Sequence, residues 1–173
     1  MFTSDQLVVH MATETDVREF VTWEYEAPYD VYNTGNDDET VAYMLRPEVQ
    51  CHTVWFEDEL IAFCTFGQDA HVPGGDYSTD ALDIGLGVRP TLTGRGLGGV
   101  VVGAVLEFAR RRFDAGGMRV TIASRNLRAI SVWVGAGFVL TSSFSTERSI
   151  LGSNEWQIYE RVPVDELTPS LDT

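Results

Sequence analysis

The stretch VRPTLTGRGLGG, residues 88–99, is the most informative part of the sequence. Four glycines fall within its last six positions: Gly94, Gly96, Gly98 and Gly99. The apolar run 81–88 in front of them is typical of a strand, and the pattern after them is helical. The first N–H groups of a helix lack intrahelical partners and carry partial positive charge. A turn needs only one glycine, so four at a strand-to-helix junction predict close approach of an anion, most naturally a diphosphate.

Composition bounds the class of protein. A chain of 173 residues with 44% apolar and 22% charged residues is expected to fold as one soluble domain, which we place at residues 1–161. Residues 162–173 are expected to form a polar, acidic tail. No apolar run reaches 18 residues and no export signal is visible, so we expect a cytoplasmic protein without membrane contact. Cys51 and Cys64 are expected to be reduced thiols.

The charge balance is strongly acidic. The formal net charge is −14, and every basic side chain other than histidine is an arginine. Phosphate backbones need basic patches, so this balance argues against a nucleic-acid partner. The one basic run, 110–112, suits the end of a helix. The acidity either attracts a cationic substrate or is a general surface adaptation, and its spread along the whole chain favours the second explanation.

The apolar periodicity predicts an α+β fold. Strands are predicted over 7–13, 52–58, 59–67, 81–88, 118–126, 138–145 and 155–161. Helices are predicted from an Asp16 cap to a break at Pro28, over 96–115, and over 127–137. This order gives hairpin-connected strands first and a parallel βαβ crossover at the centre.

A dinucleotide site is one interpretation of the glycines. Gly94, Gly96 and Gly99 fit the pattern G-x-G-x-x-G, and Asp114 follows 20 residues after the first of them. In that fold the glycines directly follow the first strand, whereas here five residues separate Val88 from Gly94 and several strands come earlier. Asp114 also falls at a helix end, and no GK[ST] for a P-loop is present. A nucleotide-dependent oxidoreductase is therefore the weaker interpretation.

Two motifs resemble the GNAT superfamily of acyl-CoA N-acyltransferases. The stretch 93–98 is similar to its diphosphate loop, Q/R-x-x-G-x-G/A, with Thr93 at the position where Gln or Arg is usual. NLRAISVWVGAGF, 126–138, is similar to N-x-x-A-x-x-x-Y-x-x-x-G-F, with Trp133 in place of the Tyr. The resemblance spans roughly 5–161 and is sharp over 81–140.

This resemblance implies a mostly antiparallel mixed sheet, flanked by helices, whose central parallel strands splay apart around acetyl-CoA. Backbone groups of 86–88 would pair with the pantetheine amides, the N–H groups from Gly94 to Gly98 would hold the diphosphate, and Asn126 would bond the pantetheine arm or simply cap a helix. The implied coenzyme-binding residues are Leu86, Gly87, Val88, Thr93, Gly94, Arg95, Gly96, Leu97, Gly98 and Asn126.

The implied reaction is direct transfer of an acetyl group to a primary amine of a small molecule or protein. A lysine-like amine is almost fully protonated at pH 7, so a general base helps, and Asp83 and His71 are the candidates. Trp133 cannot protonate the leaving thiolate because its indole does not titrate. Its alternative role is core packing. His10, His52 and His71 are scattered, so no metal site is expected.

The acceptor site and the assembly stay open. Acids and aromatics cluster at 24–32, where this family places its variable acceptor-binding segment, and such a cluster suits a cation or ordinary packing. A homodimer stays open. A non-catalytic acyl-CoA-binding sensor is the main alternative function.

The first prediction concerns the coenzyme. Coenzyme A or acetyl-CoA should raise the melting temperature, because a ligand that binds only the folded state stabilises it by about 2.7 kcal/mol at a hundredfold excess over Kd. Thermal melts with coenzyme A, NAD and NADP check this. Stabilisation by NAD or NADP but not by coenzyme A would overturn the family resemblance.

Overall fold

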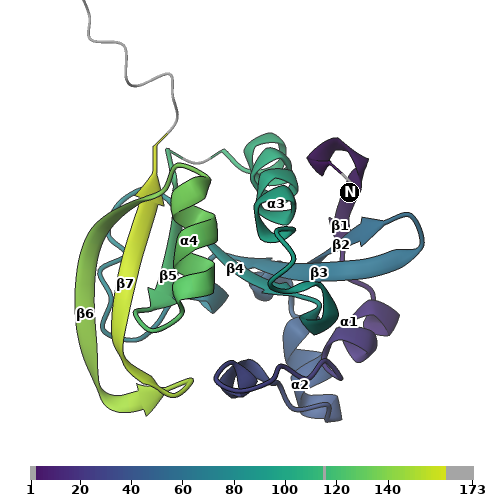
Figure 1. Cartoon of the computed structure of the whole chain (residues 1–173), viewed down its shortest axis with the longest axis horizontal. Coiled ribbons are helices and arrows are strands. Elements are labelled where there is room, and N and C mark those ends of the chain that lie inside the picture. The colour runs from purple at the N-terminus through teal and green to yellow at the C-terminus, as the bar shows by residue number, and fades with distance from the viewer. Residues whose placement is uncertain (1–2, 115, 163–173) are drawn as a thin grey trace, which may run out of the picture.

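One mixed sheet of seven strands organises the molecule, in the order β1-β2-β3-β4-β5-β7-β6 (Figure 1). The structure is a computed structural model that describes residues 3–114 and 116–162. The strands are β1 Leu7–Met11, β2 His52–Phe56, β3 Glu59–Phe66, β4 Leu82–Val88, β5 Met118–Ala123, β6 Val139–Ile150 and β7 Ser153–Arg161. Among the described strands, β4 and β5 form the one parallel pair. The predicted α+β class with a central βαβ crossover is confirmed.

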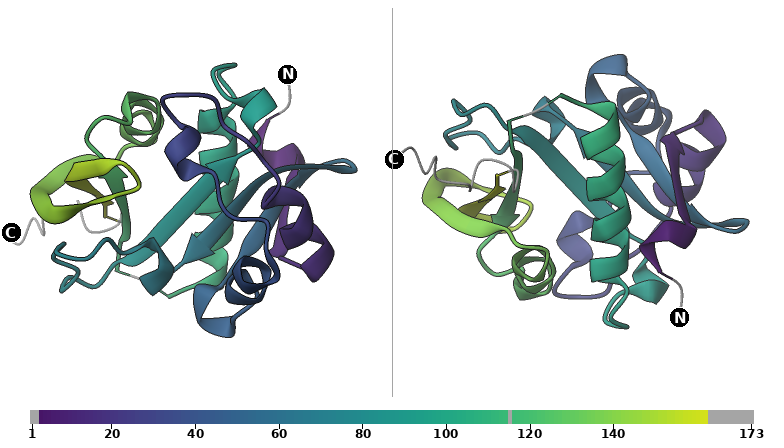
Figure 2. Two further views of the ribbon diagram at one scale, coloured as in Figure 1. Left: turned by 90° about the horizontal axis from the view of Figure 1, so that it is seen from below. Right: turned by 90° about the horizontal axis from the view of Figure 1, so that it is seen from above.

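Four α-helices cover the two faces of the sheet: α1 Glu14–Phe20, α2 Asp38–Met44, α3 Gly98–Arg112 and α4 Leu127–Gly135. In Figure 2 the view from above shows α3 crossing one face of the sheet, and the view from below shows α1 and α2 on the opposite face. The main core lies under α3 and α4 and includes Val101, Val105 and Trp133. A second core, with Phe20 and Met44, lies under α1 and α2.

Two predicted helix boundaries were wrong. Thr13, not Asp16, caps α1, because the Thr13 hydroxyl accepts from the Asp16 N–H at 3.3 Å while the Asp16 carboxylate accepts from the Thr13 N–H at 2.8 Å. This capping box places Asp16 at the third helical position. The helix ends at Phe20, well before the predicted break at Pro28.

The helix α3 and the last hairpin also differ from prediction in extent. The helix begins at Gly98 instead of Gly96, since Gly96 has a positive φ of 77° that a helix cannot accommodate. It ends at Arg112, and Ala115 lies outside the described residues.

The hairpin strands β6 and β7 are longer than predicted, because β6 is an exposed edge strand whose polar stretch lacks the apolar alternation of a half-buried strand. The predicted tail from 163 onward lies outside the described residues.

The sheet divides between β4 and β5. These strands pair at two positions only, Leu82 with Met118 and Asp83 with Arg119. Beyond Asp83, β4 stays paired with β3 up to Val88, while β5 stays paired with β7 up to Ala123. The two halves of the sheet therefore separate toward the carboxyl ends of β4 and β5, and that opening positions everything described below.

Candidate functional site

The glycine loop is built from residues that serve different purposes. Gly94 and Gly96 have positive φ values of 73° and 77°, which side-chain-bearing residues rarely adopt, and a Cβ at either would meet no other atom within 4 Å. Gly98 is needed for close packing, since a Cβ there would lie 2.8 Å from Cγ2 of Val132 on α4. The loop thus keeps a bare backbone facing open space at Gly94 and Gly96.

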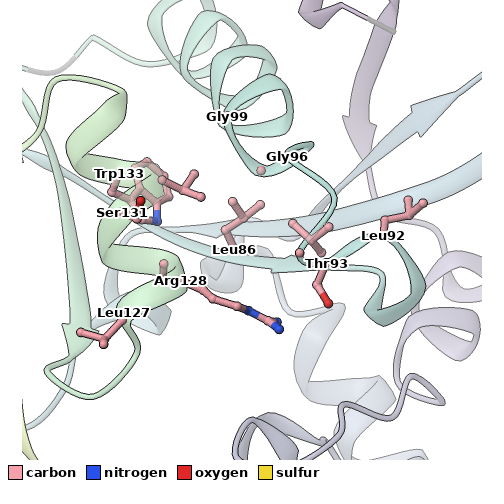
Figure 3. Close-up of a pocket in the computed structure, with 14 residues that line it drawn as sticks. Leu86, Leu92, Thr93, Gly96, Gly99, Leu127, Arg128, Ser131 and Trp133 are labelled. Atoms are coloured by element: carbon pink, nitrogen blue, oxygen red, sulfur yellow. The ribbon is translucent and has the colours of Figure 1, made fainter. Parts of the chain in front are cut away.

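The start of α3 is free to bind an anion. No side chain caps this helix, whose N-cap position is Leu97. Uncapped N–H groups and the positive end of the helix dipole favour phosphate groups. The loop borders a cavity of about 520 Å³ between α3, α4 and the end of β4, which we call the loop cleft (Figure 3).

Most of the predicted coenzyme-binding residues line this cleft: Leu86, Val88, Thr93, Gly94, Gly96 and Gly98. Gly87, Arg95 and Leu97 are not among its lining residues. Arg95 is exposed to solvent. Their part in binding stays a prediction.

One cation at the cleft was missed from the sequence. Arg128 is the third residue of the second motif, at a position that the motif leaves free, so the sequence offered no signal. In Figure 3 its side chain reaches from α4 into the loop cleft. The guanidinium carbon lies 3.9 Å from the ring centroid of Tyr29, a cation–π contact that holds it there. Arg128 adds a positive charge to a cleft suited to phosphates.

The open edge of β4 offers backbone hydrogen bonds. Arg89 donates to Ile61 of β3 at 2.8 Å, and the Asp83 carbonyl accepts from Gly67 at 2.9 Å. Antiparallel residues bond to a given neighbour at every second position, so Gly87 also faces β3. Leu86 and Val88 face the opening, where β5 has separated. Of the predicted stretch 86–88, these two can pair with an extended ligand chain.

A second cavity of about 270 Å³ opens in the split itself, and we call it the split cavity. Its walls come from both separated strands and include Gly85 of β4 and Thr121 of β5. It shares Leu86, Ala129 and Trp133 with the loop cleft. The two cavities are therefore adjacent and share these three residues in their walls.

Asn126 lies at the split cavity, at the start of α4. Its amide oxygen accepts from the Ala129 N–H at 3.1 Å, and its amide nitrogen donates to the Tyr32 hydroxyl at 3.2 Å. Asn126 is thus a helix cap, one of its two predicted roles. Its contact with a pantetheine arm stays a prediction.

Trp133 occupies the junction of the two cavities. Its side chain is buried, packs edge-on against Phe138 with ring centroids 4.9 Å apart, and belongs to the main core. It also lines both cavities. Core packing and contact with a bound thiol are therefore compatible at this position.

Asp83 and His71, the predicted base candidates, contact each other. His71 lines the split cavity, and its Nε2 lies 2.7 Å from Oδ2 of Asp83. Asp83 is buried, forms two bonds with Arg119 of β5, and lines neither cavity. Of the two, only His71 can reach a bound molecule.

The segment between α1 and α2 reaches the same site. Tyr25 donates its hydroxyl to the Val88 carbonyl at 2.9 Å, and burial raises the pKa of Tyr25 to about 12. Its phenol therefore stays protonated and keeps this bond at neutral pH. Tyr32 lines the split cavity, whereas Glu24 and Glu26 are exposed to solvent.

Two features are absent from the described residues. None of the His, Cys, Asp and Glu side chains there gathers into a group that could hold a metal ion. Over the same residues, no helix has the length and apolar character needed to cross a bilayer.

Comparison with known proteins identifies the family. The sequence model of the acetyltransferase (GNAT) family matches residues 17–138. The chain belongs to the GNAT family. This match covers both motifs and confirms the resemblance drawn from them.

Solved GNAT-fold structures share the architecture. A chimera of Vibrio cholerae spermidine N-acetyltransferase SpeG and hSSAT has a TM-score of 0.71 at 14% identity, covering 91% of this chain and 95% of that one. The putative acetyltransferase yncA from Salmonella typhimurium, solved with acetyl-CoA, has a TM-score of 0.63 at 17% identity, covering 96% and 99%. RimL, a ribosomal L7/L12 α-N-protein acetyltransferase in complex with coenzyme A, has a TM-score of 0.66 at 17% identity, covering 91% and 94%. No curated protein matched the chain.

The second prediction tests the glycine loop. Gly96→Glu should abolish coenzyme A binding in a folded protein, because the side chain fills the phosphate space and its charge repels the phosphates. Isothermal titration with coenzyme A measures this loss.

Gly67→Glu is the matched control. Gly67 has a φ of 88°, a Cβ there meets no other atom within 4 Å, and it lines neither cavity. The control therefore also places a charged side chain on a backbone with positive φ, and it should bind like the parent. Equal binding by both variants would place the diphosphate elsewhere.

Proposed function

We propose that this GNAT protein transfers an acetyl group from acetyl-CoA to a primary amine of a small molecule or a protein, by direct attack in a ternary complex. The observation that carries the proposal is the meeting of the two cavities at Leu86, Ala129 and Trp133. A donor in the loop cleft and an acceptor in the split cavity would place their reacting atoms at this junction. Direct attack within such a complex needs no covalent enzyme intermediate.

The donor end is supported by chemistry suited to coenzyme A. The bare backbone at Gly94 and Gly96 and the uncapped start of α3 suit the diphosphate. Arg128 adds charge beside it. On the edge that β5 leaves unpaired, the backbone groups of Leu86 and the N–H of Val88 suit the pantetheine amides, while the Val88 carbonyl accepts from Tyr25. An N–H on this edge could also donate a hydrogen bond to the thioester oxygen as negative charge develops on it.

The acceptor end is small. A cavity of about 270 Å³ holds the amine-bearing end of a molecule rather than a whole protein segment. Aromatic walls at Tyr32, Trp133 and Trp156 suit the apolar part of such an end. The neighbouring structures are named for acceptors as different as spermidine and a ribosomal protein, so the likeness alone names no acceptor.

The third prediction tests the function itself. With acetyl-CoA and a panel of polyamines, amino acids, aminoglycosides and peptides, the protein should release free thiol at a rate that depends on the amine. A thiol-reactive dye follows the release, and mass spectrometry should show an amine product heavier by one acetyl group. Tight acetyl-CoA binding without thiol release across the panel would favour a non-catalytic acyl-CoA sensor, an alternative that the missing Tyr at position 133 allows.

The fourth prediction concerns Trp133. Trp133→Tyr should raise turnover with similar coenzyme A affinity, because a phenol near the leaving sulfur can supply a proton that indole cannot. The smaller ring leaves space beside Phe138 and should cost about 1–3 kcal/mol of unfolding free energy, measured by urea denaturation. Unchanged turnover in a stable variant would mean that the thiolate leaves unaided or that another group protonates it.

A further inference from the structure

His71 is held in the split cavity from two directions. Its Nε2 lies 2.7 Å from Oδ2 of Asp83, and its ring stacks on Tyr77 with centroids 3.8 Å apart and planes within 6°. Tyr77 is itself fixed, because its hydroxyl accepts from the Val72 N–H at 2.8 Å and contacts Oγ1 of Thr121 at 3.0 Å. The imidazole therefore has one orientation, although its side chain is 29% exposed.

The partners of Asp83 fix the tautomer of His71. Arg119 donates to Oδ1 of Asp83 through Nε at 2.7 Å and to Oδ2 through Nη2 at 2.8 Å. A carboxylate paired with a permanently charged guanidinium is ionised and can only accept. The hydrogen of the His71–Asp83 bond is therefore on Nε2, which leaves a free lone pair on Nδ1 of neutral His71.

That lone pair is unused. Among the described residues, none forms a hydrogen bond with Nδ1 of His71. The other titratable groups around His71 are engaged or poorly suited as bases. Asp83 accepts two hydrogen bonds from Arg119, and Nη1 of Arg119 also lies 3.6 Å from Oε1 of Glu160 on β7. Both oxygens of Asp83 are therefore already engaged. Asp69, two residues before His71, accepts from the Tyr43 hydroxyl at 2.6 Å. Of the groups that line the cavity, His71 has both a suitable lone pair and a fixed direction.

We propose that His71 is the general base of the acetyl transfer, and that Asp83, Arg119 and Tyr77 position it. This inference rests on the proposed function. Nδ1 takes one proton from the ammonium group of the acceptor, and the freed amine attacks the thioester carbon. A C–N bond forms, the C–S bond breaks, and coenzyme A leaves as its thiolate. The second amine proton neutralises the thiolate, and His71 returns its own proton to solvent.

The network also gives His71 and Asp83 different roles, whereas the sequence offered both only as candidates for the general base. His71 would be a catalytic residue because it borders the acceptor. Asp83 would be a positioning residue because it lines neither cavity and acts through the imidazole. Separating these roles requires one variant of each.

The fifth prediction is the pH dependence of turnover in His71→Gln. With both substrates saturating, the rate of the parent should rise with pH and then level off, because a general base accepts the amine proton only in its unprotonated form. The variant should lose about 10²- to 10⁴-fold in kcat near pH 7. Its turnover rate should keep rising with pH, because only solvent hydroxide then deprotonates the amine. Coenzyme A affinity should not change. His10→Gln, on an exposed strand position far from both cavities, is the control and should match the parent.

The same experiment identifies the outcomes that overturn the proposal. If His71→Gln keeps the turnover and the levelling of the parent, His71 is not the base, and Asp69→Asn then tests the remaining carboxylate. If the parent itself releases no thiol with any amine, the proposed function fails first, whatever His71 does.

A readout independent of activity tests the positioning network. Nitrogen-15 NMR of the parent should show neutral His71 with its hydrogen on Nε2, and in Asp83→Asn this preference should be lost, because an amide can donate as well as accept. A hydrogen on Nδ1 in the parent would overturn the proposal. Should Asp83→Asn fail to fold with Arg119 unpaired, the tautomer of the parent still decides.

Discussion

The buried ion pair between Asp83 and Arg119 is the interaction on which the site depends. It joins β4 to β5 at the last position where those strands pair, with both side chains at most 5% exposed. Removing either partner would leave the other charge buried and unpaired at a cost of about 3–5 kcal/mol, so the two residues are required together at this point. Beyond it they separate, because Leu86 and Val88 continue alongside β3 while β5 follows β7. One pair thus closes the sheet below the opening and orients His71 beside it.

The glycine loop shows that backbone freedom and packing can be required within a few residues of each other. Gly94 and Gly96 give the chain left-handed turns that lift the backbone into the open cleft. Gly98 instead lets α3 approach Val132 of α4. A single substitution at any of these positions therefore has a different physical consequence.

The sequence predicted the donor end of the site better than the acceptor end. The glycine loop and the second motif are local patterns, so their resemblance to the GNAT motifs implied a coenzyme site between 93–98 and 126–138. Arg119 could not be recognised as the partner of Asp83, since their contact depends on the register of a parallel pair 36 residues apart in sequence. Arg128 stands at a motif position with no preferred residue type, so nothing in the sequence indicated its place in the cleft.

The predicted boundaries of α1 and β6 were wrong because sequence patterns do not fix where these elements begin and end. Asp16 and Thr13 are both good caps, and sequence alone does not say which of them is the outer partner of a capping box. At the other end of the chain, the polar residues of β6 carry no apolar alternation, and its pairing with β7 extends the strand to Ile150. A local capping box decides the start of α1, and tertiary pairing with β7 decides the length of β6; the apolar periodicity of the sequence reports neither.

The acidity of the chain belongs mainly to its surface. Of the described carboxylates, Asp16 and Asp83 are the buried ones, and Asp83 is matched by Arg119. Asp69 is the one carboxylate among the residues that line the two cavities. Exposed charges more than about 8–10 Å from a ligand are largely screened at physiological ionic strength. An anionic coenzyme in the loop cleft would therefore respond to Arg128 and the start of α3 more than to the net charge of −14. This distribution favours a general surface property over attraction of a cationic substrate as the reason for the acidity.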